Sequence, residues 1–299
     1  MTILVTGANG QLAAALRAVL PQETVFSART GEVLPHIDLS RPDGIAAILD
    51  QVSPSIIVNA AAYTAVDAAE DNEETALAVN AESVGEMGRW AFQRGAFILH
   101  VSTDYVFDGM ESQPYTEDAP IGPINAYGRS KAIGEQRLRE SGASHAILRT
   151  SWLYGPTGRN FFVTMLRLAR ERDTLRVVDD QIGSPTTTAV VAGAIHHVLG
   201  RRWTQDTSSL PAFEGTFHVT CHGQTTWYGF ARAILDGAAD RGLLDRVPRL
   251  EPVSTSAFPT AARRPAYSVL DQSKFERTFD YRLVDWQYAL DAVLDSFSP

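Results

Sequence analysis

The chain has 299 residues, a net charge of −9 and a hydrophobic content of 44%. This length suits one large domain or two tightly packed ones, and the ordinary composition excludes a disordered or fibrous protein. The acidic balance and the lack of any run rich in lysine and arginine argue against binding of nucleic acid through phosphate contacts. A few local arginines can still bind an anionic small molecule.

The single cysteine and the distribution of apolar residues indicate the compartment. Cys221 has no partner for an internal disulfide, which fits a reducing environment. No charged and apolar leader precedes "MTILVTG", and polar residues interrupt each apolar run well before the ~18 residues that a membrane span needs. We therefore expect a cytoplasmic protein without a membrane span.

Strands alternate with helices through the first half of the sequence. The expected strands are 3–5, 24–29, 55–63, 97–107 and 145–155. The expected helices are 11–20, one that starts near Pro42, the acidic region 67–94 and one containing "NAYGRSKAIGEQ" (125–136). Apolar strands that alternate with helices indicate a parallel sheet covered on both faces, so we predict an α/β fold of the Rossmann-like, doubly wound type.

The alternation changes after about residue 155. Polar, proline-rich segments such as 175–188, 217–220 and 251–270 read as loops. They are mixed with helices that we expect near 161–172, 187–199, 226–241 and 284–296. We predict a dinucleotide-binding domain over 1–155. Residues 156–299 would form mainly a smaller α/β substrate-binding domain, with segments that return to the first domain.

The stretch "TGANGQLA" places Gly7, Gly10 and Ala13 between the first strand and the first helix. Glycines at such a turn let the backbone approach a pyrophosphate, and the helix N-terminus supplies free N–H donors. The spacing is G-x-x-G-x-x-A, and a glycine pair after a strand can also be an ordinary turn. At the first strand of an α/β pattern we interpret it as a dinucleotide site.

The end of the next strand bears on the choice of cofactor. An acidic residue there suits the ribose hydroxyls of NAD, whereas an arginine suits the 2′-phosphate of NADP. Arg29 in "SARTGE" therefore favours NADPH, although NADH stays possible and Arg29 can equally be a solvated loop residue. Asp38 either faces the adenine or caps the helix that follows.

Two further motifs carry groups for proton transfer. Thr103 and Asp104 in "STDYVFDG" follow a buried strand, and ligands bind at the carboxyl edge of an open α/β sheet. Tyr127 and Lys131 lie four residues apart, so a helix presents both on one face. A free tyrosine has a pKa of ~10, and we expect a nearby ammonium and a cationic nicotinamide to lower it. Tyr127 could then donate a proton during hydride transfer.

Together these motifs resemble the extended short-chain dehydrogenase/reductase superfamily, and within it the reductases that act on a dTDP-linked 4-keto sugar. The stretches "GANGQL", "VSTDYVFDG", "PINAYGRSKAIGE", "LRTSWLYG", "DDQIGSPT" and "ARRPAYSVLD" carry the resemblance over nearly the whole chain. It implies reduction of the C4 ketone of dTDP-4-dehydro-L-rhamnose to dTDP-L-rhamnose. That step belongs to the synthesis of lipopolysaccharide and other cell-surface polysaccharides.

The resemblance also implies roles for individual residues. The catalytic residues would be Thr103, Tyr127 and Lys131. The cofactor would contact Gly7, Gly10, Gln11, Leu12, Arg29, Asp38, Leu39, Ala60, Ala61, Ala62, Tyr63, Thr64, Tyr127 and Lys131. The substrate would contact Thr103, Asp104, Trp152 and Arg264, although Trp152 can also be core packing and Arg264 a loop arginine.

Some relatives dimerise through a magnesium site built from glutamates, and Ala15 and Ala189 stand at the corresponding places here. A hard cation needs oxygen ligands, so we predict no metal site and a monomer or weak homodimer. The sugar-nucleotide dehydratases of this superfamily carry a glutamate where this chain has Tyr105. A nucleotide-sugar epimerase or a non-catalytic dinucleotide-binding regulatory subunit remains the alternative.

Overall fold

The computed structural model describes residues 2–32, 35–204 and 213–297. Its centre is a six-stranded sheet in the order β10-β5-β4-β3-β1-β2, and every neighbouring pair of strands is parallel. The strands are β1 (Ile3–Thr6), β2 (Val25–Ser27), β3 (Ile56–Asn59), β4 (Phe97–Thr103), β5 (His145–Thr150) and β10 (Gly215–His218). The predicted α/β, Rossmann-like fold is confirmed.

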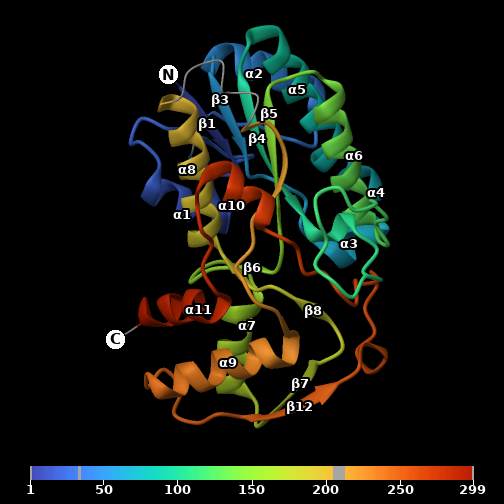
Figure 1. Cartoon of the computed structure of the whole chain (residues 1–299), viewed down its shortest axis with the longest axis vertical. Coiled ribbons are helices and arrows are strands. Elements are labelled where there is room, and N and C mark those ends of the chain that lie inside the picture. Colours follow the sequence, from blue (N-terminus) through green and yellow to red (C-terminus); the bar gives the residue numbers. More distant parts are fainter. Residues whose placement is uncertain (1, 33–34, 205–212, 298–299) are drawn as a thin grey trace.

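Side chains of the central strands alternate between two cores. Val5 and Val58 lie in one apolar cluster, whereas Leu4 and Ile57 lie in another on the opposite face of the sheet. Successive strand residues point to opposite faces, so fully apolar strands bury both. Figure 1 shows helices on each side of the sheet.

The helices divide between the two faces. The first core is covered by α1 (Gln11–Val19), α8 (Thr188–Thr204) and α10 (Ser273–Phe279). The second core is covered by α2 (Ile45–Val52), α5 (Ser83–Arg94) and α6 (Ala126–Glu140). The helices α8 and α10, which pack on the central sheet, and the strand β10, which joins it, come from the second half of the chain.

The acidic region after β3 is helical but interrupted. It comprises α3 (Val66–Asp71), α4 (Glu73–Leu77), a π-helical turn over Ala78–Glu82 and then α5. Short 3-10 turns lie at Pro42–Gly44, before α2, at Asp104–Val106, after β4, and at Thr255–Ala257.

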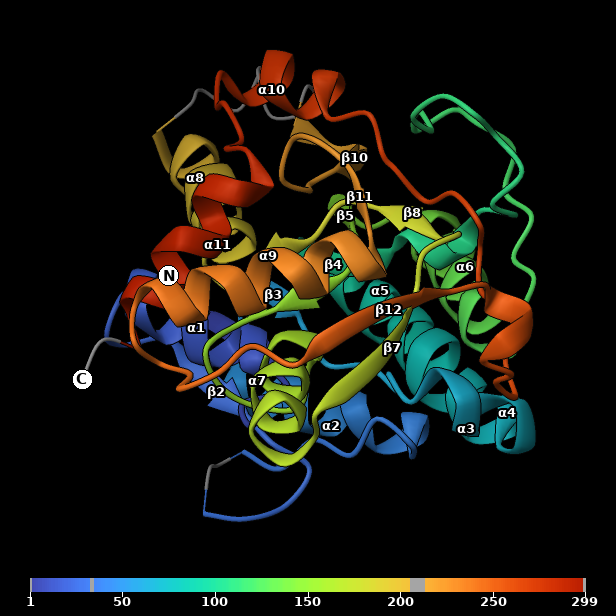
Figure 2. The same ribbon diagram turned by 90° about the horizontal axis from the view of Figure 1, so that it is seen from below.

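A second, smaller unit lies at the carboxyl edge of the sheet (Figure 1). It contains α7 (Phe161–Glu171), α9 (Trp227–Asp240), α11 (Trp286–Asp295) and the parallel pair β7 (Thr174–Val178) and β12 (Arg249–Val253). Figure 2 shows α7 and α9 beside this pair of strands. The three helices share their own apolar core. Short paired strands link the units: β6 (Leu153–Tyr154), β8 (Ile182–Gly183), β9 (Thr186–Thr187) and β11 (Thr225–Thr226).

Three segments differ from the sequence-based expectation of loops. Residues 217–220 overlap β10, which pairs with β5 at the edge of the central sheet. The start of segment 175–188 lies in β7, and the start of segment 251–270 lies in β12. Since β7 and β12 carry exposed side chains among only five residues each, and β10 is only four residues long, their apolar patterns were too short to identify them as strands. Among the described residues, no helix combines the length and apolarity that crossing a bilayer requires.

Helix α6 is fixed to the sheet by a buried ion pair. Two guanidinium nitrogens of Arg149, on β5, donate to the two carboxylate oxygens of Glu135 over 2.9 and 2.7 Å. Ser102 donates to the same carboxylate over 2.6 Å, and Arg149 and Glu135 are 1% and 0% exposed. The hydrogen bonds and the guanidinium outweigh burial and hold the pKa of Glu135 below its usual range. The pair sets the position of α6 one turn beyond Lys131.

We expect Glu135→Gln to destabilise the protein strongly, because the variant leaves the buried Arg149 without a counter-charge. Breaking such a pair costs about 3–5 kcal/mol. Urea unfolding followed by circular dichroism measures the loss. The double variant Glu135→Leu/Arg149→Met removes both charges and should lose less than Glu135→Gln; a larger loss would contradict this account.

Candidate functional site

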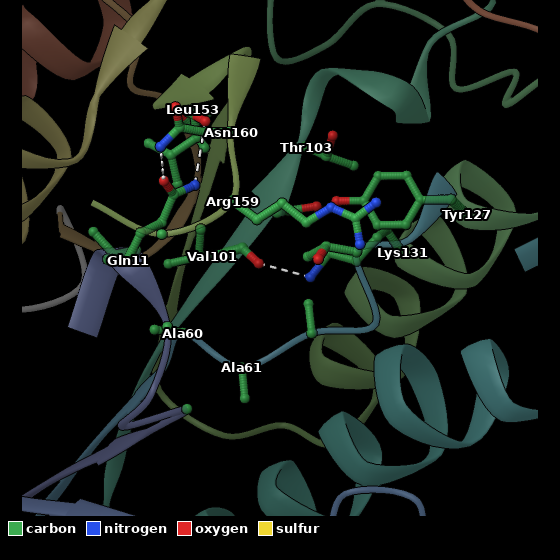
Figure 3. Close-up of a pocket in the computed structure, with 18 of the residues that line it drawn as sticks. Gln11, Ala60, Ala61, Val101, Thr103, Tyr127, Lys131, Leu153, Arg159 and Asn160 are labelled. Carbon is green, nitrogen blue, oxygen red and sulfur yellow. Dashed lines mark hydrogen bonds between the residues drawn. The ribbon is translucent and has the colours of Figure 1, made fainter. Parts of the chain in front are cut away.

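A cavity of about 730 Å³ opens at the carboxyl ends of β1, β3 and β4. The strand order reverses between β1 and β3, and such a reversal is where open α/β sheets bind ligands. Figure 3 shows the cavity, with Gln11 on one side and Tyr127 and Lys131 on the other. Its wall combines the glycine turn with the residues expected to be catalytic.

The glycine turn fits a dinucleotide. Gly7 has a φ of +80°, and a Cβ there would lie 3.0 Å from the Cα of Ala61. Gly10 begins α1 without a capping side chain, and a Cβ on it would lie 3.1 Å from the Gly7 carbonyl oxygen. The first N–H groups of α1 therefore face the cavity uncapped, as an anion-binding helix N-terminus requires.

A loop from the second half of the chain, residues 155–160, closes over the same turn. Asn160 Nδ2 donates to Gln11 Oε1 over 3.0 Å, and Gln11 Nε2 donates to the Leu153 carbonyl over 3.2 Å. Figure 3 shows these bonds. The loop and the N-terminus of α1 therefore form one wall of the cavity.

Of the two residues expected near the adenine end of a cofactor, Arg29 lines the cavity and Asp38 does not. Arg29 is exposed and lines the cavity at the end of β2. Asp38 accepts from the backbone N–H and the hydroxyl of Ser40, over 3.0 and 2.7 Å. Burial opposes its ionisation, but these hydrogen bonds and the guanidiniums of Arg29 and Arg41 hold its pKa below the ordinary value. Asp38 thus organises the turn before α2.

Thr103 and Tyr127 lie side by side at the inner end of the cavity. The Thr103 hydroxyl donates to Asp104 Oδ1 over 3.0 Å and accepts from the backbone N–H of Tyr105 over 3.2 Å. Burial raises the pKa of Tyr127 to about 12, a hydrogen bond with Thr103 lowers it in part, and Asp104 raises it. Tyr127 is therefore a neutral phenol, the form that can donate a proton.

Lys131 is buried beneath Tyr127. Its Nζ donates to the Val101 carbonyl over 2.7 Å and lies 3.2 Å from His100 Nε2. Burial lowers the pKa of Lys131 to about 8, opposed by Glu135. We expected the ammonium of Lys131 to lower the pKa of Tyr127. In the protein without cofactor that pKa is raised instead, and among the described residues Lys131 does not contribute to the shift.

Asp104 is a buried carboxyl group aimed at the cavity. It is 1% exposed, and its Oδ2 has no hydrogen-bond partner among the described residues. Burial raises its pKa to about 7, and the nearby hydroxyls of Ser268 and Thr103 offset part of that rise. An unpartnered buried oxygen next to Thr103 can bind a hydroxyl group of a ligand.

Trp152 lines the cavity in a strained conformation. Its φ is +46°, and its ring stacks on that of Trp227 with centroids 3.5 Å apart and planes 5° apart. Gly183 lies directly beneath it, because a Cβ there would come within 2.4 Å of the indole. Unusual backbone conformations of this kind cluster at functional sites.

The cavity brings together most of the residues that the sequence indicated. It is lined by Gly7, Gly10, Gln11, Leu12, Arg29, Ala60, Ala61, Ala62, Thr64, Thr103, Asp104, Tyr127, Lys131 and Trp152. Four others do not line it. Asp38 forms its local turn, Leu39 is buried in the second core, and Tyr63 packs near Tyr127 in a small apolar cluster. Arg264 lies in another cavity.

That second cavity, of about 720 Å³, lies in the smaller unit. It is lined by aromatic residues and arginines, among them Phe161, Trp227, Phe258, Arg167, Arg172, Arg176 and Arg264. Arg264 forms a bidentate ion pair with Asp67 over 3.0 and 2.7 Å. Since Trp152 lines the first cavity and Trp227 the second, the stacked indoles separate the two.

Sequence reasoning missed several residues of the first cavity, including Thr150, Ser151, Arg159 and Asn160. Thr150 ends β5, so its position at the carboxyl edge of a strand was a usable signal. Arg159 and Asn160 belong to "YGPTGRN", which offers no such signal because a folded-back loop brings it to α1. Ala15 packs against the first core, Ala189 is exposed, and the described residues contain no cluster of metal-binding side chains.

Comparisons with known proteins agree with this geometry. Residues 1–298 match the family model described as "RmlD substrate binding domain". A dTDP-4-dehydrorhamnose reductase of Burkholderia thailandensis is 43% identical over 299 residues, covering 97% of each chain. One of Escherichia coli K12 is 39% identical over 296 residues, covering 99% of this chain and 97% of that one.

A solved structure gives the same result. The dTDP-4-dehydrorhamnose reductase of Bacillus anthracis, in complex with NADP, superimposes with a TM-score of 0.87 at 34% identity and covers 99% of each chain. The family model and the relatives span nearly the whole sequence, and the chain therefore belongs to the RmlD substrate binding domain family, within the extended short-chain dehydrogenases/reductases.

Proposed function

We propose that this chain reduces the C4 ketone of dTDP-4-dehydro-L-rhamnose to dTDP-L-rhamnose with NADPH, in the cytoplasm. One observation carries the proposal: Thr103, Tyr127 and Lys131 line the same cavity as the glycine turn. The relatives of nearly equal length named for this activity support it. The product is a nucleotide-activated sugar of the kind used to build cell-surface polysaccharides.

The chemistry assigns one task to each group of the site. NADPH, when bound, supplies the hydride. The hydroxyl of Tyr127 polarises the ketone by donating to its oxygen and delivers the proton, and Thr103 would donate to the same oxygen after giving up its hydrogen bond to Asp104. Lys131, held by the Val101 carbonyl, would bind the cofactor ribose and stabilise the phenolate that the proton leaves behind.

The second cavity supplies a place for the nucleotide part of the substrate. Aromatic walls of Phe161, Trp227 and Phe258 suit a base, and arginines suit a diphosphate. Arg172 and Arg176 are candidates for the diphosphate, because the described residues give neither side chain an ion pair. Arg264 is committed to Asp67, so we propose that it fixes the loop around the cavity.

Tyr105 bears on the alternative of a dehydratase. It follows Asp104 at the place of the dehydratase glutamate, and burial raises its pKa far above neutrality. The side chain therefore cannot take up a proton from a sugar carbon at neutral pH, which favours reduction over dehydration.

Tyr127→Phe should reduce NADPH oxidation in the presence of dTDP-4-dehydro-L-rhamnose by at least about 100-fold, the usual scale for a lost general acid. NADPH binding should change little, since the ring remains in place. The loss of NADPH absorbance measures turnover, and calorimetric titration measures NADPH binding. Tyr288→Phe, an exposed tyrosine on α11, serves as the control. Undiminished turnover in Tyr127→Phe would exclude the mechanism.

Arg29→Met should weaken NADPH binding by roughly tenfold or more and leave NADH binding nearly unchanged, since a lost charged hydrogen bond costs about 1.5–3 kcal/mol. The reason is that the two cofactors differ only in the 2′-phosphate that Arg29 would bind. Parallel titrations of both cofactors measure the ratio. Equal weakening of both cofactors would place the 2′-phosphate elsewhere.

Asp104→Asn should change how stability depends on pH. Burial raises the pKa of Asp104 from 3.8 to about 7, so the folded chain keeps a proton that the unfolded chain releases. The wild type therefore loses stability as pH rises from about 4 to about 7, whereas the amide does not titrate. The difference in melting temperature, variant minus wild type, should grow across this interval. A constant difference would contradict the raised pKa.

A further inference from the structure

Arg159 is a cation of the first cavity that neither the mechanism nor the motifs use. It is exposed, follows Gly158 in the loop 155–160, and makes no hydrogen bond or ion pair within the described part of the chain. Figure 3 shows its side chain reaching across the cavity toward Tyr127 and Lys131. A long guanidinium side chain in this position lies across the path of any ligand that joins the glycine turn to Tyr127.

The backbone on both sides of Arg159 contacts Gln11, the residue that follows the glycine turn. A Cβ on Gly158 would lie 3.5 Å from the Cβ of Gln11, and Asn160 donates to the Gln11 side chain over 3.0 Å. Asn160 also donates to the carbonyls of Gly155 and Thr157, over 3.0 and 3.1 Å. The loop therefore holds the Cα of Arg159 close to the N-terminus of α1.

Among the charged side chains of the cavity, none yet assigned a role is placed to bind the pyrophosphate of a dinucleotide. The charged side chains of its lining are Arg29, Asp104, Lys131 and Arg159. Arg29 stands at the adenine side and Lys131 is held at the inner end by the Val101 carbonyl. Between them the glycine turn offers N–H groups but no charged side chain, whereas a pyrophosphate brings two negative charges there.

We propose that Arg159 binds the pyrophosphate of the dinucleotide cofactor, opposite the N-terminus of α1. This inference rests on the proposed function, because it requires a dinucleotide in the first cavity. A guanidinium matches two phosphate oxygens at once, which an ammonium cannot do. The cofactor is thereby held from both sides, by N–H groups of the sheet domain and by a cation of the loop that leads into the smaller unit.

Calorimetric titration of purified full-length protein with NADPH, NADH and dTDP tests this assignment. We expect Arg159→Gln to weaken NADPH and NADH by the same factor, on the order of tenfold, because both carry the pyrophosphate. Binding of dTDP should stay unchanged. Arg159→Lys should recover only part of the loss. Arg89→Gln, in an exposed ion pair on α5, controls for loss of a surface charge.

Two results would overturn the inference. Unchanged dinucleotide binding in Arg159→Gln would show that Arg159 contributes nothing to the cofactor, and a selective loss of dTDP binding would assign the guanidinium to the sugar nucleotide. Failure of the proposed function looks different, since the wild type itself would then bind neither NADPH nor NADH. Melting temperatures of the variants without ligand show whether a weakened affinity follows from a damaged fold.

Discussion

The close packing of α6 against the turn after β4 and against the π-helical turn is the constraint on which the candidate site depends. A Cβ on Gly128 would lie 2.1 Å from the Tyr105 carbonyl oxygen, and one on Gly134 would lie 1.9 Å from that of Asn80. No other residue fits at these distances. The helix can therefore lie where Glu135 reaches Arg149 on β5 and Lys131 reaches the Val101 carbonyl on β4. The positions of Tyr127 and Lys131 are consequences of packing as much as of hydrogen bonding.

This depth of burial also determines the electrostatics. It raises the pKa of Tyr127, lowers that of Lys131 to about 8 and raises that of Asp104 to about 7. Each shift favours the neutral form, because removing a charge from water is costly. With a pKa of about 8, Lys131 keeps most of its positive charge at neutral pH, so Lys131 and a bound cationic nicotinamide ring would both act on the phenol.

The sequence predicted the parts of the site that follow from periodicity and strand ends. Buried strands and glycine turns have local signatures, so the positions of β1 to β5 along the sequence, the glycine turn and the Tyr127–Lys131 pair could all be predicted. Arg159 could not, because only tertiary folding brings its loop onto Gln11. The strand β10 was missed for a related reason: it is four residues long and joins the sheet from a distant part of the chain. Short edge strands carry too few residues for alternation to be recognised.

The pair Trp152 and Trp227 shows how the two units together form the wall between the two cavities. A non-glycine residue at a φ of +46° costs about 1–3 kcal/mol, which the surrounding structure must offset. The stacking on Trp227 and the space left by Gly183 provide contacts that hold the strained conformation. Trp227 also donates to Gln181, which donates to Thr255 in the loop after β12. The wall between the first cavity and the arginine-rich cavity is thus built from residues of both halves of the chain. A ligand that reaches the wall from the first cavity would contact the indole of Trp152, whose strained conformation is held by residues of both halves of the chain.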